Sequence, residues 1–98
     1  MRLLVAEDEK SLNRVITKRL KNEGYSVDSC FNGEEALLYA ETGEFDAIIM
    51  DIMMPKINGI EAVKTLRSRN DSTPVIFLTA KDSIPDRVAG LDAGKQRS

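Results

Sequence analysis

The sequence predicts an α/β fold in which helices cover both faces of a parallel sheet. Short apolar runs alternate along the chain with segments whose apolar residues fall at helical spacing, and glycine or proline separates many of them. Strands that alternate with helices pair in parallel, because each helix carries the chain back to the starting edge of the sheet. We therefore predict the order βαβαβαβα in one domain, since 98 residues suffice for a single hydrophobic core.

Four segments have the character of strands. They are Leu3–Ala6, Tyr25–Phe31, Phe45–Met50 and Pro74–Leu78. The first, third and fourth are almost continuously apolar, which is typical of strands buried on both faces of a parallel sheet. In the second, Cys30 is predicted to be a small core residue.

Four further segments carry apolar residues at helical spacing. These residues are Leu12, Val15, Ile16 and Leu20; Ala36, Leu37 and Ala40; Ile60, Val63 and Leu66; and Ile84, Val88 and Leu91. Gly24 and Gly43 are predicted to end the first two helices. Pro55 and Asn58-Gly59 indicate a loop before the third helix.

The composition excludes several classes of function. A net charge of -2 gives no electrostatic reason for this segment to bind nucleic acid. The absence of histidine excludes histidine catalysis and histidine metal ligands. The single cysteine excludes an internal disulfide and suits a reducing compartment. No apolar run is long enough to span a membrane and no signal-peptide pattern is present, so a soluble, cytoplasmic module without a membrane partner is predicted.

Acidic or hydroxyl side chains follow three of the predicted strands. Glu7-Asp8-Glu9 follow the first strand, Asp51 follows the third and Thr79 follows the fourth. The carboxyl ends of strands in an open α/β sheet line one crevice, so these side chains are expected to converge. Acids at strand ends are also often helix caps or solvated turns, and for Glu7 or Asp8 alone that alternative stays open.

The predicted crevice has the chemistry of a cation and phosphoryl site. Neighbouring carboxylates repel one another, which raises their pKa values unless a cation neutralises them. Oxygen ligands favour a hard cation such as Mg²⁺. Asp51 is then a candidate covalent phosphoryl acceptor, and the hydroxyl of Thr79 is placed to donate to a phosphoryl oxygen. Met50, Met53 and Met54 flank Asp51 and are expected to pack, although Met53 has a positional role as well.

The chain resembles the receiver domain of two-component response regulators, which has a flavodoxin-like fold. The residues that carry the resemblance are Leu4-Val5-Ala6-Glu7-Asp8-Glu9, Asp46-Ala47-Ile48-Ile49-Met50-Asp51-Ile52-Met53-Met54-Pro55, Asn58-Gly59, Pro74-Val75-Ile76-Phe77-Leu78-Thr79-Ala80 and Ala89-Gly90-Leu91-Asp92-Ala93-Gly94. Together, in this order and at these distances, the motifs are highly specific.

The resemblance implies a role for each residue of the predicted site. Glu7 and Asp8 are similar to the metal-binding acid pair of the family, and Asp51 is similar to its phosphoacceptor. Met53 is expected to offer its backbone carbonyl to Mg²⁺, and Thr79 to be the switch hydroxyl. A sensor histidine kinase supplies the phosphoryl group in this family, and the receiver assists its own phosphorylation without being an enzyme. The sequence style is similar to that of receivers attached to winged-helix DNA-binding domains, which implies control of transcription through a DNA-binding domain absent from this chain.

The chain departs from the family after Gly94. Receivers continue into a fifth strand, which carries a lysine that contacts the phosphoryl group, and a fifth helix. Here residues 95–98 form a polar tail of native or foreign origin, and Lys95 is not assigned the role of that lysine. We therefore predict a truncated domain over residues 1–94. Its open apolar edge beside the fourth strand is expected to pair with another chain, giving dimers or larger assemblies.

Other interpretations were weighed against the receiver. A haloacid-dehalogenase-type phosphatase requires a second acid two residues after its nucleophile, and Met53 stands there. A flavin mononucleotide binder requires a phosphate loop after the first strand, where Glu7-Asp8-Glu9 would repel phosphate. The alternative that stays open is a non-signalling, self-assembling scaffold, because the strand-borne lysine has no counterpart.

Overall fold

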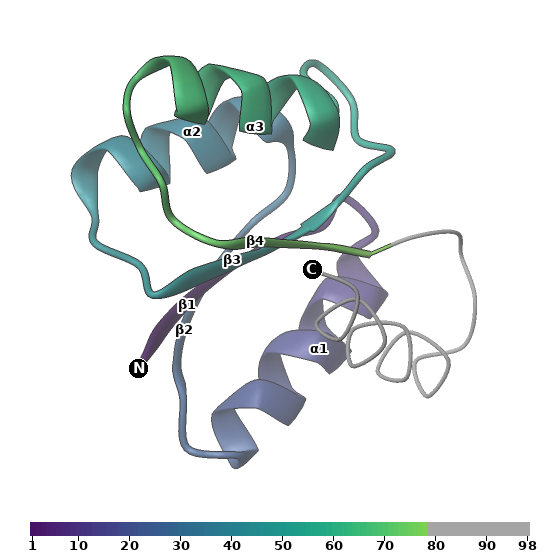
Figure 1. The fold of residues 1–98 in the computed structure, drawn as a ribbon. Coiled ribbons are helices and arrows are strands. Elements are labelled where there is room, and N and C mark those ends of the chain that lie inside the picture. Colours follow the sequence, from purple (N-terminus) through teal and green to yellow (C-terminus); the bar gives the residue numbers. More distant parts are fainter. Residues whose placement is uncertain (79–98) are drawn as a thin grey trace.

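The computed structural model describes residues 1–78, which form one parallel sheet with helices on both faces (Figure 1). The strands are β1 (Arg2–Ala6), β2 (Ser26–Cys30), β3 (Ala47–Asp51) and β4 (Val75–Leu78), and the helices are α1 (Lys10–Asn22), α2 (Gly33–Thr42) and α3 (Gly59–Ser68). The strand order is β2-β1-β3-β4. The predicted doubly wound α/β architecture is confirmed over these residues. The helix expected at Ile84, Val88 and Leu91 lies outside them.

Strand β1 supplies side chains to two cores, one on each face of the sheet. Leu4 and Ala6 pack with residues of α2 and α3, whereas Leu3 and Val5 pack with Ile16 and other residues on the α1 side. Successive side chains of a strand point to opposite faces, so a continuous apolar run is what a strand covered on both sides requires. Figure 1 shows this arrangement, with α1 on one face of the sheet and α2 and α3 on the other.

Three strands begin later than the sequence indicated, and one of them also ends earlier. β2 covers Ser26–Cys30, without the flanking aromatic residue at either end, β3 begins at Ala47 instead of Phe45, and β4 begins at Val75 instead of Pro74. Before β3, Asp46 accepts a hydrogen bond from the backbone N–H of Arg2 at 2.7 Å. The guanidinium of Arg2 lies 4.6 Å from the centre of the Phe45 ring. Phe45 therefore packs against the core from the segment before β3, and β3 begins two residues later, at Ala47.

The predicted stop at the end of α1 is explained by the backbone. α1 ends at Asn22, and Gly24 follows with φ of 98°, a left-handed conformation that glycine adopts without steric cost. Cys30 is buried at the end of β2, as predicted, and burial raises the pKa of its thiol to about 12. Among residues 1–78, none of the helices has both the length and the apolar character needed to cross a membrane.

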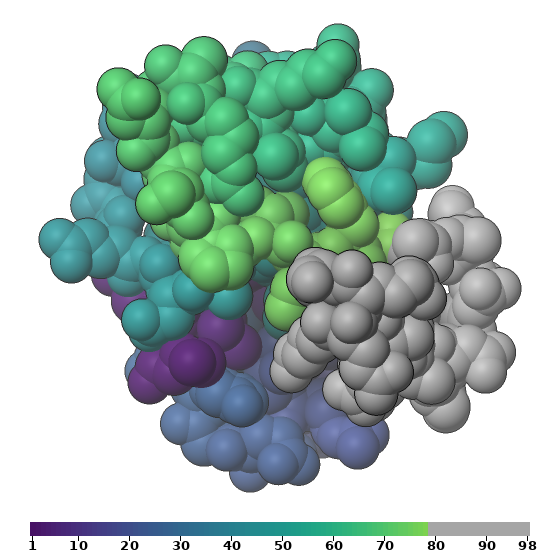
Figure 2. Space-filling model, in the orientation of Figure 1, coloured from purple at the N-terminus to yellow at the C-terminus, as the bar shows by residue number. Residues whose placement is uncertain are grey.

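The connections place a topological switch between β1 and β3. The chain passes from β1 to β2 on one side of β1, then crosses β1 to reach β3 on the other side. The helices before and after this reversal, α1 and α2, therefore lie on opposite faces, and a crevice opens at the carboxyl ends of β1 and β3, where ligands bind in such sheets. In the space-filling view α3 forms one end of the molecule and α1 the other (Figure 2).

Candidate metal centre

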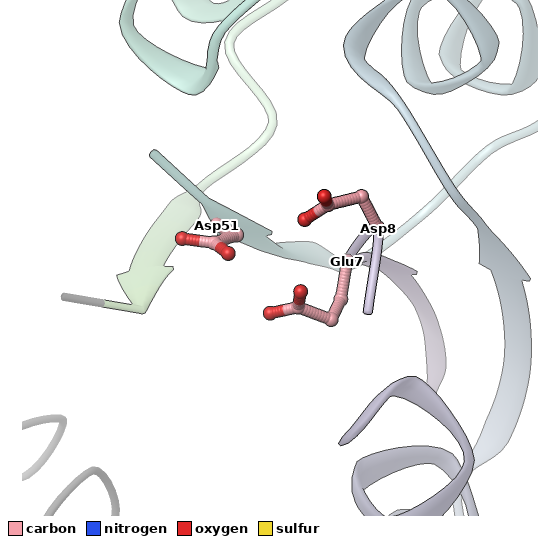
Figure 3. A group of neighbouring side chains, drawn as sticks. All are labelled: Glu7, Asp8 and Asp51. Atoms are coloured by element: carbon pink, nitrogen blue, oxygen red, sulfur yellow. The ribbon is translucent and has the colours of Figure 1, made fainter. Parts of the chain in front are cut away.

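Three carboxylates lie together where β1 and β3 end. Ala6 of β1 pairs with Met50 of β3, so the next residues of the two strands, Glu7 and Asp51, fall at the same level. One oxygen each of Glu7, Asp8 and Asp51 lies within 4.8 Å of the others. Figure 3 shows their carboxylate groups directed toward one shared space. The structure thus brings together three of the four acids that the sequence analysis expected to converge in this crevice.

The three carboxylates differ in how much water they contact. Glu7 is 1% exposed and Asp51 is 5% exposed, whereas Asp8 is exposed. Burial and the nearby carboxyl groups of Asp51 and Asp8 together raise the pKa of Glu7 to about 7, against a hydrogen bond from the Glu9 N–H that lowers it. That N–H donates to Glu7 Oε2 at 2.9 Å. At neutral pH the centre therefore holds a proton or attracts a cation in its place.

The third acid of the turn, Glu9, has a different task. Its carboxylate accepts hydrogen bonds from the backbone N–H groups of Ser11 at 2.9 Å and Leu12 at 3.2 Å. Glu9 is the N-cap of α1 and satisfies donors that the first turn of a helix leaves without partners. The helix-cap alternative was raised for Glu7 or Asp8, but the residue that caps α1 is Glu9, whereas Glu7 and Asp8 belong to the carboxylate cluster.

The side chain of Asn13 holds the turn between β1 and α1 in place. The sequence alone did not predict this role. The Asn13 side chain is 2% exposed and donates to the backbone carbonyls of Glu7 at 3.0 Å and Cys30 at 2.9 Å. The Thr17 hydroxyl donates to Asn13 Oδ1 at 3.2 Å. One amide therefore joins α1 to the ends of β1 and β2. The only signal in the sequence is a polar residue beside Leu12 on the apolar stripe of the helix.

The loop from Asp51 to α3 is held by close backbone contacts. A Cβ on Gly59 would lie 2.6 Å from the carbonyl oxygen of Asp51, and a Cβ on Gly33 would lie 2.0 Å from that of Ile57. Only glycine allows the first turns of α2 and α3 to approach the loop so closely. The loop is therefore packed between the first turns of α2 and α3. This packing fixes the path of the backbone directly after Asp51.

Met53 lies directly beside the carboxylate cluster. Its backbone N–H donates to Asp51 Oδ1 at 3.3 Å. The expectation that Met50, Met53 and Met54 all pack is wrong for one of them. Met50 and Met54 are buried, but the Met53 side chain is 73% exposed, because the loop turns it toward solvent.

The cluster has the donor set of a hard-cation site. Carboxylate oxygens are ligands that Mg²⁺ prefers, and a group of two buried acids and one exposed acid leaves room for water on its open side. Binding of a cation removes the repulsion that raises the pKa of Glu7. The residues present therefore fit Mg²⁺. Thr79 and Lys95 lie outside the described residues.

Comparison with known proteins identifies the family. The family described as response regulator receiver domain matches residues 3–97, and the chain belongs to this family. The transcriptional regulatory protein DltR of Streptococcus agalactiae (strain NEM316) is 49% identical over 94 residues, which cover 96% of this chain and 42% of that protein. The chain thus spans about two fifths of the length of this curated relative. Receiver domains are phosphoacceptors.

Solved structures of receivers share the fold. The receiver domain of the Francisella response regulator 1452 matches with a TM-score of 0.79 and 39% identity, covering 95% of this chain and 77% of that one. The response regulator TrrA from Thermotoga maritima, in complex with Mg²⁺ and BeF, matches with a TM-score of 0.77 and 38% identity, covering 83% of this chain and 70% of that one. These similarities confirm the predicted receiver fold.

Proposed function

We propose that this chain is a Mg²⁺-dependent phosphoacceptor in which Asp51 receives the phosphoryl group. The observation that carries the proposal is the meeting of Glu7, Asp8 and Asp51 within 4.8 Å at the switch point of the sheet. Membership of the receiver family supports it. The TrrA structure, which is in complex with Mg²⁺ and BeF, supports the same cation here.

Glu7, Asp8, Asp51 and the backbone carbonyl of Met53 are the proposed ligands of Mg²⁺. When bound, the cation neutralises charge on the carboxylates and on the phosphoryl oxygens. The residues of the chain hold the reacting groups in position. The N–H of Met53 orients one oxygen of Asp51, and the buried Glu7 limits access of water from the side of the sheet. Thr79, which follows β4, is proposed to donate its hydroxyl to the phosphoryl group.

The proposed reaction is transfer from a sensor histidine kinase to Asp51. An oxygen of Asp51 attacks phosphorus, the bond from phosphorus to the donor nitrogen breaks, and that nitrogen keeps the electron pair of the bond and is protonated. The phosphoryl group passes from the donor nitrogen to Asp51 and stays on this chain. The chain therefore assists its own phosphorylation and turns over no separate substrate. We place this exchange in the cytoplasm and assign it to a domain over residues 1–94.

The output of the proposed switch is transcription. DltR, with which the chain shares 49% identity, is named as a transcriptional regulatory protein. We propose that DNA is reached through another part of the regulator, because the matched region covers 42% of DltR and the net charge of this chain is -2.

Intact-mass spectrometry tests the phosphoacceptor directly. The chain is incubated with acetyl phosphate and Mg²⁺, and we expect an added mass of one phosphoryl group that requires Mg²⁺. Asp51→Asn, which keeps the size of the side chain, should show no adduct, whereas Asp46→Asn at the other end of β3 should behave as the wild type. An adduct of equal yield in Asp51→Asn, or none in a folded wild type, contradicts the proposal.

A scaffold is the second candidate function, and one observation favours it. Within the described residues β4 pairs with β3 alone, and its Val75, Ile76 and Phe77 are only partly buried. An apolar edge strand is a template for pairing with another chain. We propose dimers or larger assemblies through this edge, and X-ray scattering over a concentration series tests them. A monomer at every concentration, together with a phosphoryl adduct, would exclude the scaffold.

A further inference from the structure

Charge is sharply segregated along this chain. The helix α1 carries five basic residues and no acid. These are Lys10, Arg14, Lys18, Arg19 and Lys21. The chain from residue 22 to residue 55 carries acids and no lysine or arginine. In a protein with a net charge of -2 this pattern gives two regions of opposite sign instead of a uniform acidic surface.

The basic region contains a groove. It has a volume of about 490 Å³, lies between α1 and the end of β2, and is lined by Lys10, Arg14, Lys18 and Lys21 together with Phe31. The four basic positions are spaced by four, four and three residues, so they form one stripe along the helix. Phe31 is 38% exposed and adds an apolar contact to this basic groove. Within residues 1–78 the ion pairs are Arg2–Asp28 and Glu34–Lys56, and neither involves α1.

The acidic region carries a projecting apolar side chain. Leu38 of α2 is 58% exposed, and Glu34 and Glu41 lie four residues before it and three after it on the same helix face. The contact of Glu34 with Lys56 is 3.7 Å long and both side chains are more than half exposed, so this ion pair is weak. Glu41 lines a small cavity together with Arg69 and Asp71 of the α3 side. We call Glu34, Leu38 and Glu41 the acidic knob, and the groove beside α1 the basic groove.

The acidic knob and the basic groove match in spacing as well as in charge. Glu34 and Glu41 are seven residues apart on α2, as are Arg14 and Lys21 on α1. Seven residues of a helix span about 10 Å, so two carboxylates can reach two cations at once. Leu38 and Phe31 add one exposed apolar side chain to each surface, and apolar contact combined with complementary charge is found at specific protein interfaces.

One molecule cannot bring its own knob and groove together. The helices α1 and α2 lie on opposite faces of the sheet (Figure 1). We propose that the acidic knob of one copy of this chain docks in the basic groove of a second copy, giving a head-to-tail contact. The contact joins two different surfaces, so a third copy can add to either end. It uses neither the carboxylate cluster nor β4 and is independent of the proposed function.

Sedimentation velocity over a concentration series tests the head-to-tail contact. At low ionic strength the wild type should associate, and raising the salt to about 0.5 M should weaken association at least about tenfold, because exposed charges are screened. Arg14→Glu/Lys18→Glu and Glu34→Lys/Glu41→Lys should each be monomeric alone. An equal mixture of the two variants should associate, because each then meets a partner of opposite charge.

Matched controls separate this contact from general charge effects and from strand pairing. Lys18→Glu in the groove and Lys64→Glu on the exposed surface of α3 make the same charge change, and only the first should weaken association. Leu38→Ala should weaken it without changing charge. A wild type that stays monomeric at low salt overturns the proposal. Association that is insensitive to salt and to Lys18→Glu also overturns it and points to pairing through β4.

Discussion

The two turns that bring carboxylates to the site are built in different ways. The turn from β1 to α1 is short and is held by side chains, with Glu9 capping the helix and Asn13 holding the carbonyl of Glu7. The longer loop from β3 to α3 is held by the backbone, which Gly33 and Gly59 approach closely. The first turn should therefore be sensitive to loss of polar groups, and the second to added volume.

Gly33→Ala is the strongest test of the backbone-held loop. In a helix free of contacts this change stabilises by about 1 kcal/mol, because alanine has the higher helix propensity. Here the new Cβ would lie 2.0 Å from the carbonyl oxygen of Ile57, so we expect destabilisation of about 3 kcal/mol. Urea denaturation measures it. Gly24→Ala is the control, because no atom lies within 4 Å and only its φ of 98° is penalised, at about 1 kcal/mol.

The yield of phosphorylation should depend on the same close approach of Gly33 to Ile57. If the loop moves to relieve the Gly33→Ala clash, the yield of the Asp51 adduct should fall more than in Gly24→Ala under equal conditions. A Gly33→Ala protein more stable than the wild type would show that the loop is not held by this contact.

Asn13→Ala is the corresponding test of the side-chain-held turn. The change leaves two buried carbonyls, those of Glu7 and Cys30, without the amide that satisfies them. Each lost buried bond costs about 1 kcal/mol or more, so the unfolding free energy should fall by about 2 kcal/mol. Thr17→Val removes only the hydroxyl that donates to Asn13 and should cost less than half as much.

The affinity for Mg²⁺, measured by calorimetry, should also fall in Asn13→Ala. Without the amide, the backbone carbonyl of Glu7 is no longer held, and the carboxylates of Glu7 and Asp8 lose their fixed position. Equal affinity in the variant and the wild type would show that the turn keeps its geometry without Asn13.

The charge of Glu7 gives the third test, through pH. The pKa of Glu7 is raised from 4.5 to about 7, so the folded state holds a proton that the unfolded state has lost between these values. Stability from this group therefore falls as pH rises from 4.5 through 7. Without Mg²⁺, Glu7→Gln should be more stable than the wild type by about 3 kcal/mol at pH 8 and equal to it near pH 4.

Mg²⁺ should reverse this difference at pH 8, because the cation stabilises the ionised wild type and has one ligand fewer in the variant. Thermal melts of both proteins at the two pH values, with and without Mg²⁺, measure the effect. A difference between the proteins that does not change with pH would contradict the raised pKa.

Much of the fold and part of the site could be predicted from the sequence. The apolar runs of β1 and β3 are visible because strands buried on both faces need apolar residues in succession. Asp51 is then conspicuous as the charge that ends such a run, and the parallel order places Glu7 beside it. Local pattern and topology were sufficient for these residues.

Other features depend on contacts that no local pattern contains. Asn13 acts on Cys30, which is distant in sequence, and Gly33 acts on Ile57 in a loop after the next strand. The different fates of Glu7 and Glu9 depend on which side chain turns inward after β1. The sequence also shows the opposite charges of α1 and α2, but their position on opposite faces is known only from the fold.

The helix caps give the smallest effect and the closest comparison of the two turns. α1 begins with a carboxylate, Glu9, which accepts from Ser11 and Leu12, and α3 begins with Asn58 in a capping box with Glu61. Loss of a cap costs about 1 kcal/mol, so Glu9→Ala and Asn58→Ala should be similar in unfolding free energy. They should differ in Mg²⁺ affinity. Glu9→Ala keeps the backbone N–H that bonds Glu7 but frees the start of α1, which lies directly after the acid pair, whereas Gly59 still holds the loop in Asn58→Ala. Equal Mg²⁺ affinity in the two variants would show that side chains do not hold the first turn.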